Sequence, residues 1–164
     1  MTNEEALNLG VMYYNGTLVE QDYDKAFELF KQAEALGNQE AYRWLGFCYY
    51  DGDGTRYCNE KAFKYFEKAI EFNPKDGKAL WFLGNCYYYG NGTERNFQKD
   101  FEYYLQSAEL GFQKAFFDLS HCYYKGKSVK KDLNKALYWA EKCINQWWID
   151  KIKKEIKEEM EREK

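Results

Sequence analysis

The apolar residues of this chain recur at helical spacing, in pairs of segments that glycine-rich turns separate. In the clearest pair, the first segment carries Ala41, Leu45, Cys48 and Tyr49. The second segment also places its apolar residues on one helical face, at Ala62, Phe63, Phe66, Ala69 and Ile70. The pattern predicts two helices. Neither could bury its apolar face alone, so neighbouring pairs are expected to stack into a continuous core.

This pair of helices is predicted to occur four times. The first helix of each repeat holds a Leu-Gly pair or its equivalent, about 36 residues after the previous one, at Leu9-Gly10, Leu45-Gly46, Leu83-Gly84 and Leu119-Ser120. A tyrosine pair and then a glycine follow each time, and the second helix opens at Lys25-Ala26, Lys61-Ala62, Lys99-Asp100 and Lys135-Ala136. We therefore expect four repeats, over residues 3–37, 38–75, 76–111 and 112–146.

Two segments depart from this period. Residues 73–77 lengthen the turn between the second and third repeats, and Asp76 is the predicted N-cap of the helix that follows. After the fourth repeat, an i, i+4 stripe runs along an otherwise charged segment, at Trp148, Ile152, Ile156 and Met160. The stripe predicts a C-terminal capping helix over residues 147–164, with a frayed end from residue 158.

The composition narrows the class of protein. Aromatic residues make up 20% of the chain, and this content excludes a disordered segment. The apolar runs are too short to span a bilayer, and the residues after Met1 lack the basic and apolar regions of a signal peptide. A net charge of −3 argues against a surface for duplex DNA. Five cysteines cannot all pair internally, so we expect a reducing compartment, the cytoplasm.

The repeat resembles the Sel1-like repeat, a helical hairpin related to the tetratricopeptide repeat. The second repeat carries the resemblance most fully, at Ala41, Leu45, Gly46, Tyr49, Gly52, Gly54, Lys61 and Ala62. The spacing from Gly46 to Ala62 and the period of about 36 residues are both longer than in tetratricopeptide repeats. The pattern has departures, with Leu18 and Ser128 in place of the second loop glycine, Asp100 in place of alanine and Ser120 in place of glycine.

The resemblance covers about residues 3–146. It implies an all-α fold, a right-handed α-solenoid of four Sel1-like helical hairpins plus a C-terminal capping helix. It also implies a scaffold or adaptor for protein–protein interaction that has no chemistry of its own.

By similarity to tetratricopeptide proteins, the first helix of each repeat would line a concave face that binds a peptide or partner protein. The predicted binding residues are Arg43, Trp44, Phe47, Tyr50, Lys78, Trp81, Phe82, Asn85, Tyr88, Tyr89, Lys114, Phe117, His121 and Tyr124. Aromatic residues with a few charges are typical of an interface core. The second tyrosine of each pair occurs in every repeat, which favours a structural role in packing the repeats. The aromatics that differ between repeats, such as Trp44 and Trp81, favour ligand binding, although some could be buried between helices.

Motifs that resemble catalytic or metal sites are better explained by the fold. Ser128-Val129-Lys130-Lys131 matches S-x-x-K, and Cys58 is a loop thiol, but neither has a catalytic partner near it in the sequence. Cys48, Cys86 and Cys122 share one repeat position and are predicted to be buried apolar residues. A single histidine and the absence of C-x-x-C give no zinc set. We expect no catalytic residue, no metal and no cofactor.

Alternatives to the concave face stay open. One basic cluster, formed by Lys125, Lys127, Lys130, Lys131 and Lys135, could meet an acidic partner or a phosphate backbone. The chain would then be an accessory subunit of a nucleic-acid-associated or enzymatic complex, although we do not expect direct binding of nucleic acid or membrane. The C-terminal cap with Trp147, the convex helices and a second copy of the chain are further alternatives.

Overall fold

The computed structural model describes residues 1–162, which form nine α-helices and no strand. The helices are α1 (Asn3–Asn15), α2 (Tyr23–Ala35), α3 (Ala41–Asp51), α4 (Asn59–Phe72), α5 (Gly77–Tyr89), α6 (Phe97–Glu109), α7 (Gln113–Lys125), α8 (Leu133–Lys142) and α9 (Gln146–Arg162). The last two residues of the segment that we expected to fray lie outside the described part of the chain.

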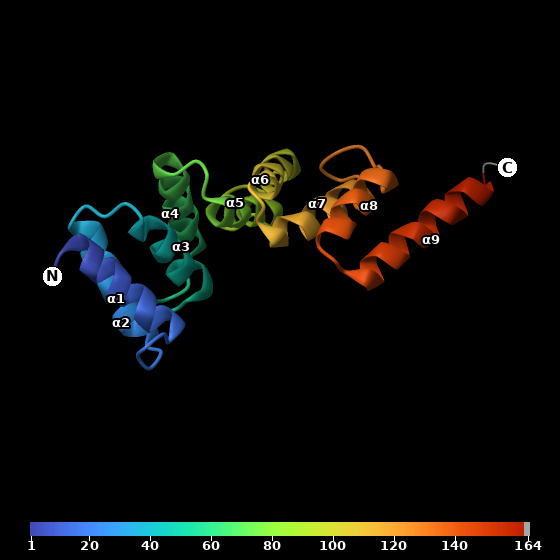
Figure 1. Cartoon of the computed structure of the whole chain (residues 1–164). Helices are drawn as coiled ribbons and strands as arrows, with labels where there is room; N and C mark the ends of the chain where they lie inside the picture. Colours follow the sequence, from blue (N-terminus) through green and yellow to red (C-terminus); the bar gives the residue numbers. More distant parts are fainter. Residues whose placement is uncertain (163–164) are drawn as a thin grey trace.

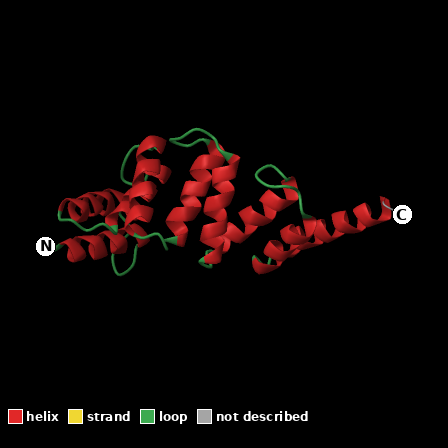
Figure 2. Cartoon of the chain, turned by 90° about the horizontal axis from the view of Figure 1, so that it is seen from above, coloured by secondary structure: helices red, strands yellow, loops and turns green. Residues whose placement is uncertain are grey.

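The helices stack as hairpins along an elongated molecule whose two ends lie far apart (Figures 1 and 2). The hairpins are α1–α2, α3–α4, α5–α6 and α7–α8, and each joins the next through its second helix. Helix α9 packs against α8 at the end of the stack. The predicted all-α solenoid of four hairpins plus a C-terminal capping helix is confirmed.

Residues with special backbone or capping chemistry set the helix ends. Gly52 ends α3 in the left-handed conformation, with φ of 81°, which glycine adopts without steric cost. The other first helices also end at a left-handed glycine. Asp76 is the N-cap of α5, as predicted, because its carboxylate accepts a hydrogen bond of 3.0 Å from the Ala79 amide.

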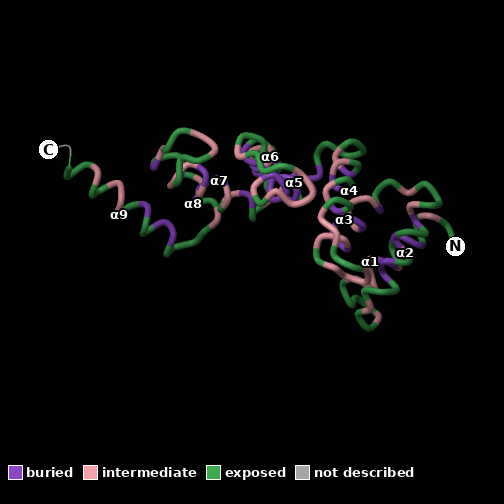
Figure 3. The backbone as a smooth tube through the Cα atoms, turned by 180° about the vertical axis from the view of Figure 1, so that it is seen from behind, coloured by how far each residue is buried: buried purple, intermediate pink, exposed green. Residues whose placement is uncertain are grey.

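Each of the first three hairpins closes by placing an aromatic ring of the second helix on a glycine of the first. A Cβ added at Gly46 would lie 2.6 Å from Cε1 of Phe66, and Gly10 and Gly84 face Phe30 and Tyr104 in the same way. The three glycines and the three rings are all buried, and Figure 3 colours the buried stretches of the backbone purple. The Leu-Gly pair of the sequence is therefore a packing device that lets two helices approach each other.

The fourth hairpin solves the same packing problem with different residues. Ser120 replaces the glycine, and Ala140 of α8 stands where the other second helices have a ring. The indole of Trp148, from α9, makes its hydrogen bond there instead: its Nε1 donates to Ser120 Oγ at 2.7 Å. Ser120 Oγ in turn donates to the Ala136 carbonyl at 2.7 Å. The capping helix thus supplies the ring that the last hairpin lacks.

Two further departures from the repeat also contact each other. Asp100 replaces the alanine of the third repeat and is fully buried, and Ser128 replaces the second loop glycine of the fourth repeat. Ser128 Oγ donates to Asp100 Oδ1 at 3.0 Å. Within residues 1–162, Asp100 Oδ2 has no hydrogen-bond partner. Burial raises the pKa of the Asp100 carboxyl to about 6, although the hydrogen bond from Ser128 opposes the shift.

Asp100→Ala should therefore stabilise the protein at pH 7.5, by about 2 kcal/mol. A carboxyl whose pKa is higher in the folded state binds more protons folded than unfolded between about pH 4 and 6. Its unfavourable charge is absent below this range and is fully present above it. The stability gain of the variant should then vanish at pH 4. Urea unfolding at both pH values measures it, with Asp24→Ala on the exposed side of α2 as the control. An equal gain at both pH values would exclude the buried charge as its cause.

Candidate protein-binding surface

The first helices α1, α3, α5 and α7, together with the start of α9, share one face of the solenoid, which we call the first-helix face. Side chains join these helices across the repeats. The rings of Tyr14 and Trp44 lie 5.3 Å apart between α1 and α3, and Phe47 and Phe82 lie 4.9 Å apart between α3 and α5. Phe117 and Trp148 continue the series at 5.7 Å between α7 and α9. Ring contacts therefore link these helices across the repeats, and four of the predicted binding residues take part in them.

Three of the predicted binding residues belong to the core. Phe47 and Phe82 are buried, with their rings around Phe66 of the second hairpin. Asn85 is also buried, and its Oδ1 accepts a hydrogen bond of 2.7 Å from the Tyr104 hydroxyl. Phe47 faces the third hairpin, Phe82 packs back on the second, and Asn85 faces α6 of its own hairpin. These three side chains stabilise the stack and offer almost no surface to a partner.

The other predicted residues keep solvent-accessible surface. Tyr89 is 58% exposed and Phe117 is 39% exposed, and both lysines are exposed. The half-exposed residues are Arg43, Trp44, Tyr50, Trp81, Tyr88, His121 and Tyr124. The second tyrosine of each pair packs on a ring of another helix, for example Tyr124 on Trp148 at 4.8 Å. This packing agrees with the structural role that the recurrence of these tyrosines favours.

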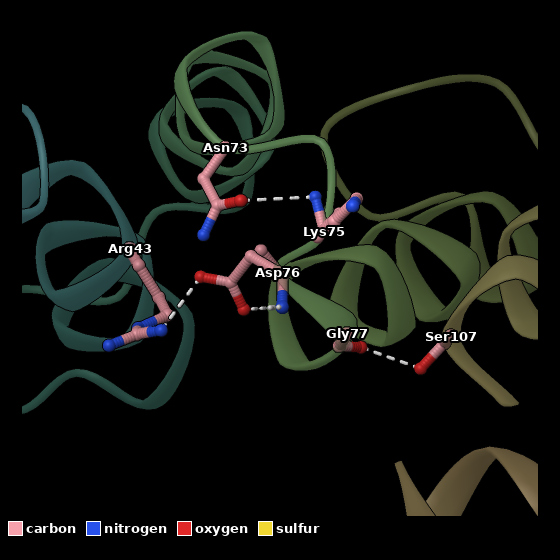
Figure 4. A network of polar contacts seen from close by, with 7 residues as sticks. Arg43, Asn73, Lys75, Asp76, Gly77 and Ser107 are labelled. Atoms are coloured by element: carbon pink, nitrogen blue, oxygen red, sulfur yellow. Dashed lines mark hydrogen bonds and ion pairs between the residues drawn. The ribbon is translucent and has the colours of Figure 1, made fainter. Parts of the chain in front are cut away.

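Hydrogen bonds between repeats fix several of these side chains. Trp81 Nε1 donates to the Asp118 carboxylate at 2.6 Å, from α5 to α7. Arg43 Nη1 lies 2.8 Å from Asp76 Oδ2, so Asp76 caps α5 and binds α3 at the same time (Figure 4). Beside it, Ser107 Oγ donates to the Gly77 carbonyl at 2.6 Å. Arg43, one of the predicted binding residues, is thus engaged in holding two repeats together.

A pocket of about 200 Å³ opens between α5 and α7. Its lining is mostly aromatic and consists of Tyr88, Tyr89, Tyr104, Phe117, Asp118, His121 and Cys122. Burial raises the pKa of the Asp118 carboxyl to about 6, and the hydrogen bond from Trp81 opposes this shift. Burial lowers the pKa of His121, and nearby lysines lower it further. Four of the seven lining residues were predicted to bind a partner. We name this cavity the α5–α7 pocket.

Lysines lie over aromatic rings along the same face. Lys78 Nζ is 4.1 Å from the ring centroid of Phe47, and Lys114 Nζ is 5.1 Å from that of Trp81. Lys151 of α9 lies 5.3 Å from the ring of Trp148. Such cation–π contacts hold a cation at an aromatic surface without neutralising its charge. Lys151 was missed because it lies on the capping helix, outside the repeat from which the binding positions were derived.

A larger cavity, of about 350 Å³, lies at the junction of the second and third repeats. It is lined by residues that include Glu40, Arg43, Phe72 and Asp76. The Arg43–Asp76 ion pair occupies one side, and Phe72 at the end of α4 is nearly half exposed. The two cavities therefore differ in their lining, which is mostly polar between the second and third repeats and mostly aromatic between the third and fourth.

The candidate chemical residues are engaged in the fold. The hydroxyl of Ser128 bonds to Asp100, and Cys58 Sγ lies 3.5 Å from a Glu60 carboxylate oxygen. Cys48, Cys86 and Cys122 are buried as predicted, and burial raises the pKa of each thiol to about 12. Within residues 1–162, no group of three or more His, Cys, Asp or Glu residues could hold a metal ion.

The basic cluster is partly neutralised. Lys131 lies 2.7 Å from Glu155 and 2.9 Å from Glu159, both on α9. Its ammonium group therefore ties the loop before α8 to the capping helix. No helix in the part of the chain that the structure describes is long and apolar enough to cross a membrane.

Stacked helical hairpins with short glycine turns and a terminal helix define an α-solenoid repeat protein. The Sel1 repeat model matches four segments of the chain, residues 6–38, 39–71, 77–112 and 114–146. The chain belongs to the Sel1 repeat family. Proteins of this family are generally interaction scaffolds. No curated protein matches the sequence significantly.

Solved structures share this fold. The chain is similar to c5321, a protective antigen of uropathogenic Escherichia coli strains with an SLR fold, at 28% identity over 86% of this chain and 30% of that one, with a TM-score of 0.76. A Sel1 repeat protein of Oxalobacter formigenes matches at 27% identity over 86% and 57%, with a TM-score of 0.73. Cysteine-rich protein B of Helicobacter pylori matches at 27% identity over 78% and 90%, with a TM-score of 0.55. The chain thus spans less than two thirds of the first two proteins.

Proposed function

We propose that the chain is a non-catalytic scaffold or adaptor that holds a peptide segment or partner protein on its first-helix face. The observation that carries this proposal is the set of half-exposed aromatic side chains that α3, α5 and α7 present on this face, together with the α5–α7 pocket. Aromatic residues fixed by their neighbours offer a large contact area and lose little conformational freedom on binding. The second helices present fewer of them.

The proposal also assigns the chain to a cellular compartment. Its five cysteines are free thiols in the structure, three of them buried. Free thiols of this kind persist in a reducing compartment, so we assign the chain to the cytoplasm. The basic cluster is the weaker candidate surface, because Lys131 is already paired with α9.

A double variant, Tyr89→Ala with Phe117→Ala, should lose the partner. Both side chains are exposed walls of the α5–α7 pocket, and removing a central aromatic contact commonly weakens an interface by about 2 kcal/mol or more. Captured proteins are quantified by mass spectrometry with the immobilised wild-type chain and the variant side by side.

The matched control is Tyr138→Ala, which removes an equally exposed aromatic side chain from the second helix α8. It should capture as much partner as the wild-type chain. Circular dichroism melting curves of all three proteins establish that the fold is intact. If the control and the double variant lose the same proteins to the same extent, the first-helix face is not the binding surface.

A further inference from the structure

The charges on the first-helix face are distributed unevenly. Near the amino-terminal end, Glu4 and Glu40 line an open cavity, and Asp51 and Asp53 lie close enough that Asp53 helps to raise the pKa of Asp51. The other end is basic. A ligand that spans this face would therefore meet opposite charges at its two ends.

Lysines surround the aromatic α5–α7 pocket. Lys114 lies over Trp81, whose indole bonds to Asp118 in the pocket wall. Three more lysines lie near His121, which follows Asp118 by one turn of α7, because the charges of Lys125, Lys127 and Lys151 each lower the pKa of His121. Within residues 1–162, none of these four lysines forms an ion pair with a carboxylate.

The pocket contains one acidic group, Asp118, against these four lysines. Asp118 is held by the Trp81 indole, and burial moves its pKa towards neutrality. The pocket therefore combines mostly aromatic walls with a rim on which four lysines outnumber one buried carboxyl group. An occupant gains most when it places an apolar side chain between the rings and carboxylates beside the lysines.

We propose that the α5–α7 pocket binds an acidic peptide segment, with one leucine- or phenylalanine-sized side chain inside the pocket and flanking carboxylates on Lys114 and Lys151. This inference rests on the proposed function and specifies the chemistry of its partner. A peptide fits better than a nucleic acid, because the volume of about 200 Å³ suits a single side chain and the acidic end of the same face would repel a phosphate backbone.

The test begins with an unbiased library of twelve-residue peptides selected on the full chain. Enriched peptides should carry Asp or Glu on both sides of a leucine or aromatic residue. A fluorescent peptide with one Phe between Glu-Asp pairs then serves as the defined probe in anisotropy titrations. Lys114→Glu with Lys151→Glu should weaken its binding at least about tenfold, and Lys142→Glu on α8 should leave it unchanged. The indole NH resonance of Trp81 should shift when the probe binds.

Each other outcome has a defined meaning. Neutral or basic peptides that lose binding with Tyr89→Ala and Phe117→Ala would overturn this inference and leave the proposed function standing. Failure to enrich any peptide that depends on these two residues would count against both. Tighter binding of a single-stranded oligonucleotide than of the probe would overturn the inference in favour of nucleic acid. A dimer in light scattering that the lysine variants dissociate would assign the pocket to a second copy of the chain.

Discussion

Replacing Trp148 with alanine should destabilise the protein by about 3–5 kcal/mol, the usual range for a buried large aromatic side chain. Trp148 is only 3% exposed and fixes α9 on the last hairpin. Its indole contacts the rings of Phe117, His121 and Tyr124. The substitution also removes the indole N–H that donates a hydrogen bond to the Ser120 hydroxyl. Chemical unfolding monitored by circular dichroism measures the loss.

The neighbouring tryptophan is a natural control. Trp147 is 68% exposed, so Trp147→Ala removes an indole of equal size from the surface. This change should lower the free energy of unfolding by less than about 1 kcal/mol. Equal losses for both variants would show that the indole of Trp148 does not fill the gap that Ala140 leaves. The probe peptide should also bind Trp148→Ala poorly, because Phe117 and Lys151 both contact this indole.

The sequence was sufficient to predict the hairpins, because the determinants of each hairpin are local. Gly46 and Phe66 lie in the same repeat, and the glycine that ends each first helix needs only its own conformation. The stripe that begins at Trp148 and Ile152 likewise indicated a capping helix from its helical spacing alone, and both side chains are buried. Because the hairpin pattern recurs four times along the chain, chance does not explain it.

The binding surface was harder to predict because it depends on how repeats pack against each other. The similarity to tetratricopeptide proteins placed Phe47 and Phe82 on the binding face with Trp44 and Trp81. The first two rings instead pack against each other between the second and third hairpins. The pairing of Asp100 with Ser128 could have been suspected, because both break the repeat pattern, but their contact spans two hairpins. Contacts between repeats are set by the stacking geometry, which the period of the sequence does not specify.

Gly46→Ala should destabilise the protein by about 3 kcal/mol, although alanine is the better helix former by about 1 kcal/mol. The new methyl group would lie 2.6 Å from a ring carbon of Phe66. The ring cannot move aside, because it is fully buried and stacks on Phe82 at 4.9 Å with Phe47 at 5.6 Å. The second hairpin would have to open, and the strain would reach the third. Thermal and urea unfolding should both show the loss.

Gly77→Ala provides a control with the same substitution at the first residue of α5, where the gain in helix propensity is smaller than in a helix interior. A Cβ at Gly77 would meet its nearest neighbour, the Cβ of Phe112, at 3.4 Å, an ordinary contact distance. This variant should be as stable as the wild-type protein or slightly more stable. The double variant Gly46→Ala with Phe66→Leu should lose less free energy of unfolding than the two single variants lose in total, because the smaller side chain removes the clash. Simple additivity would contradict the assignment of this glycine to the close approach of α3 and α4.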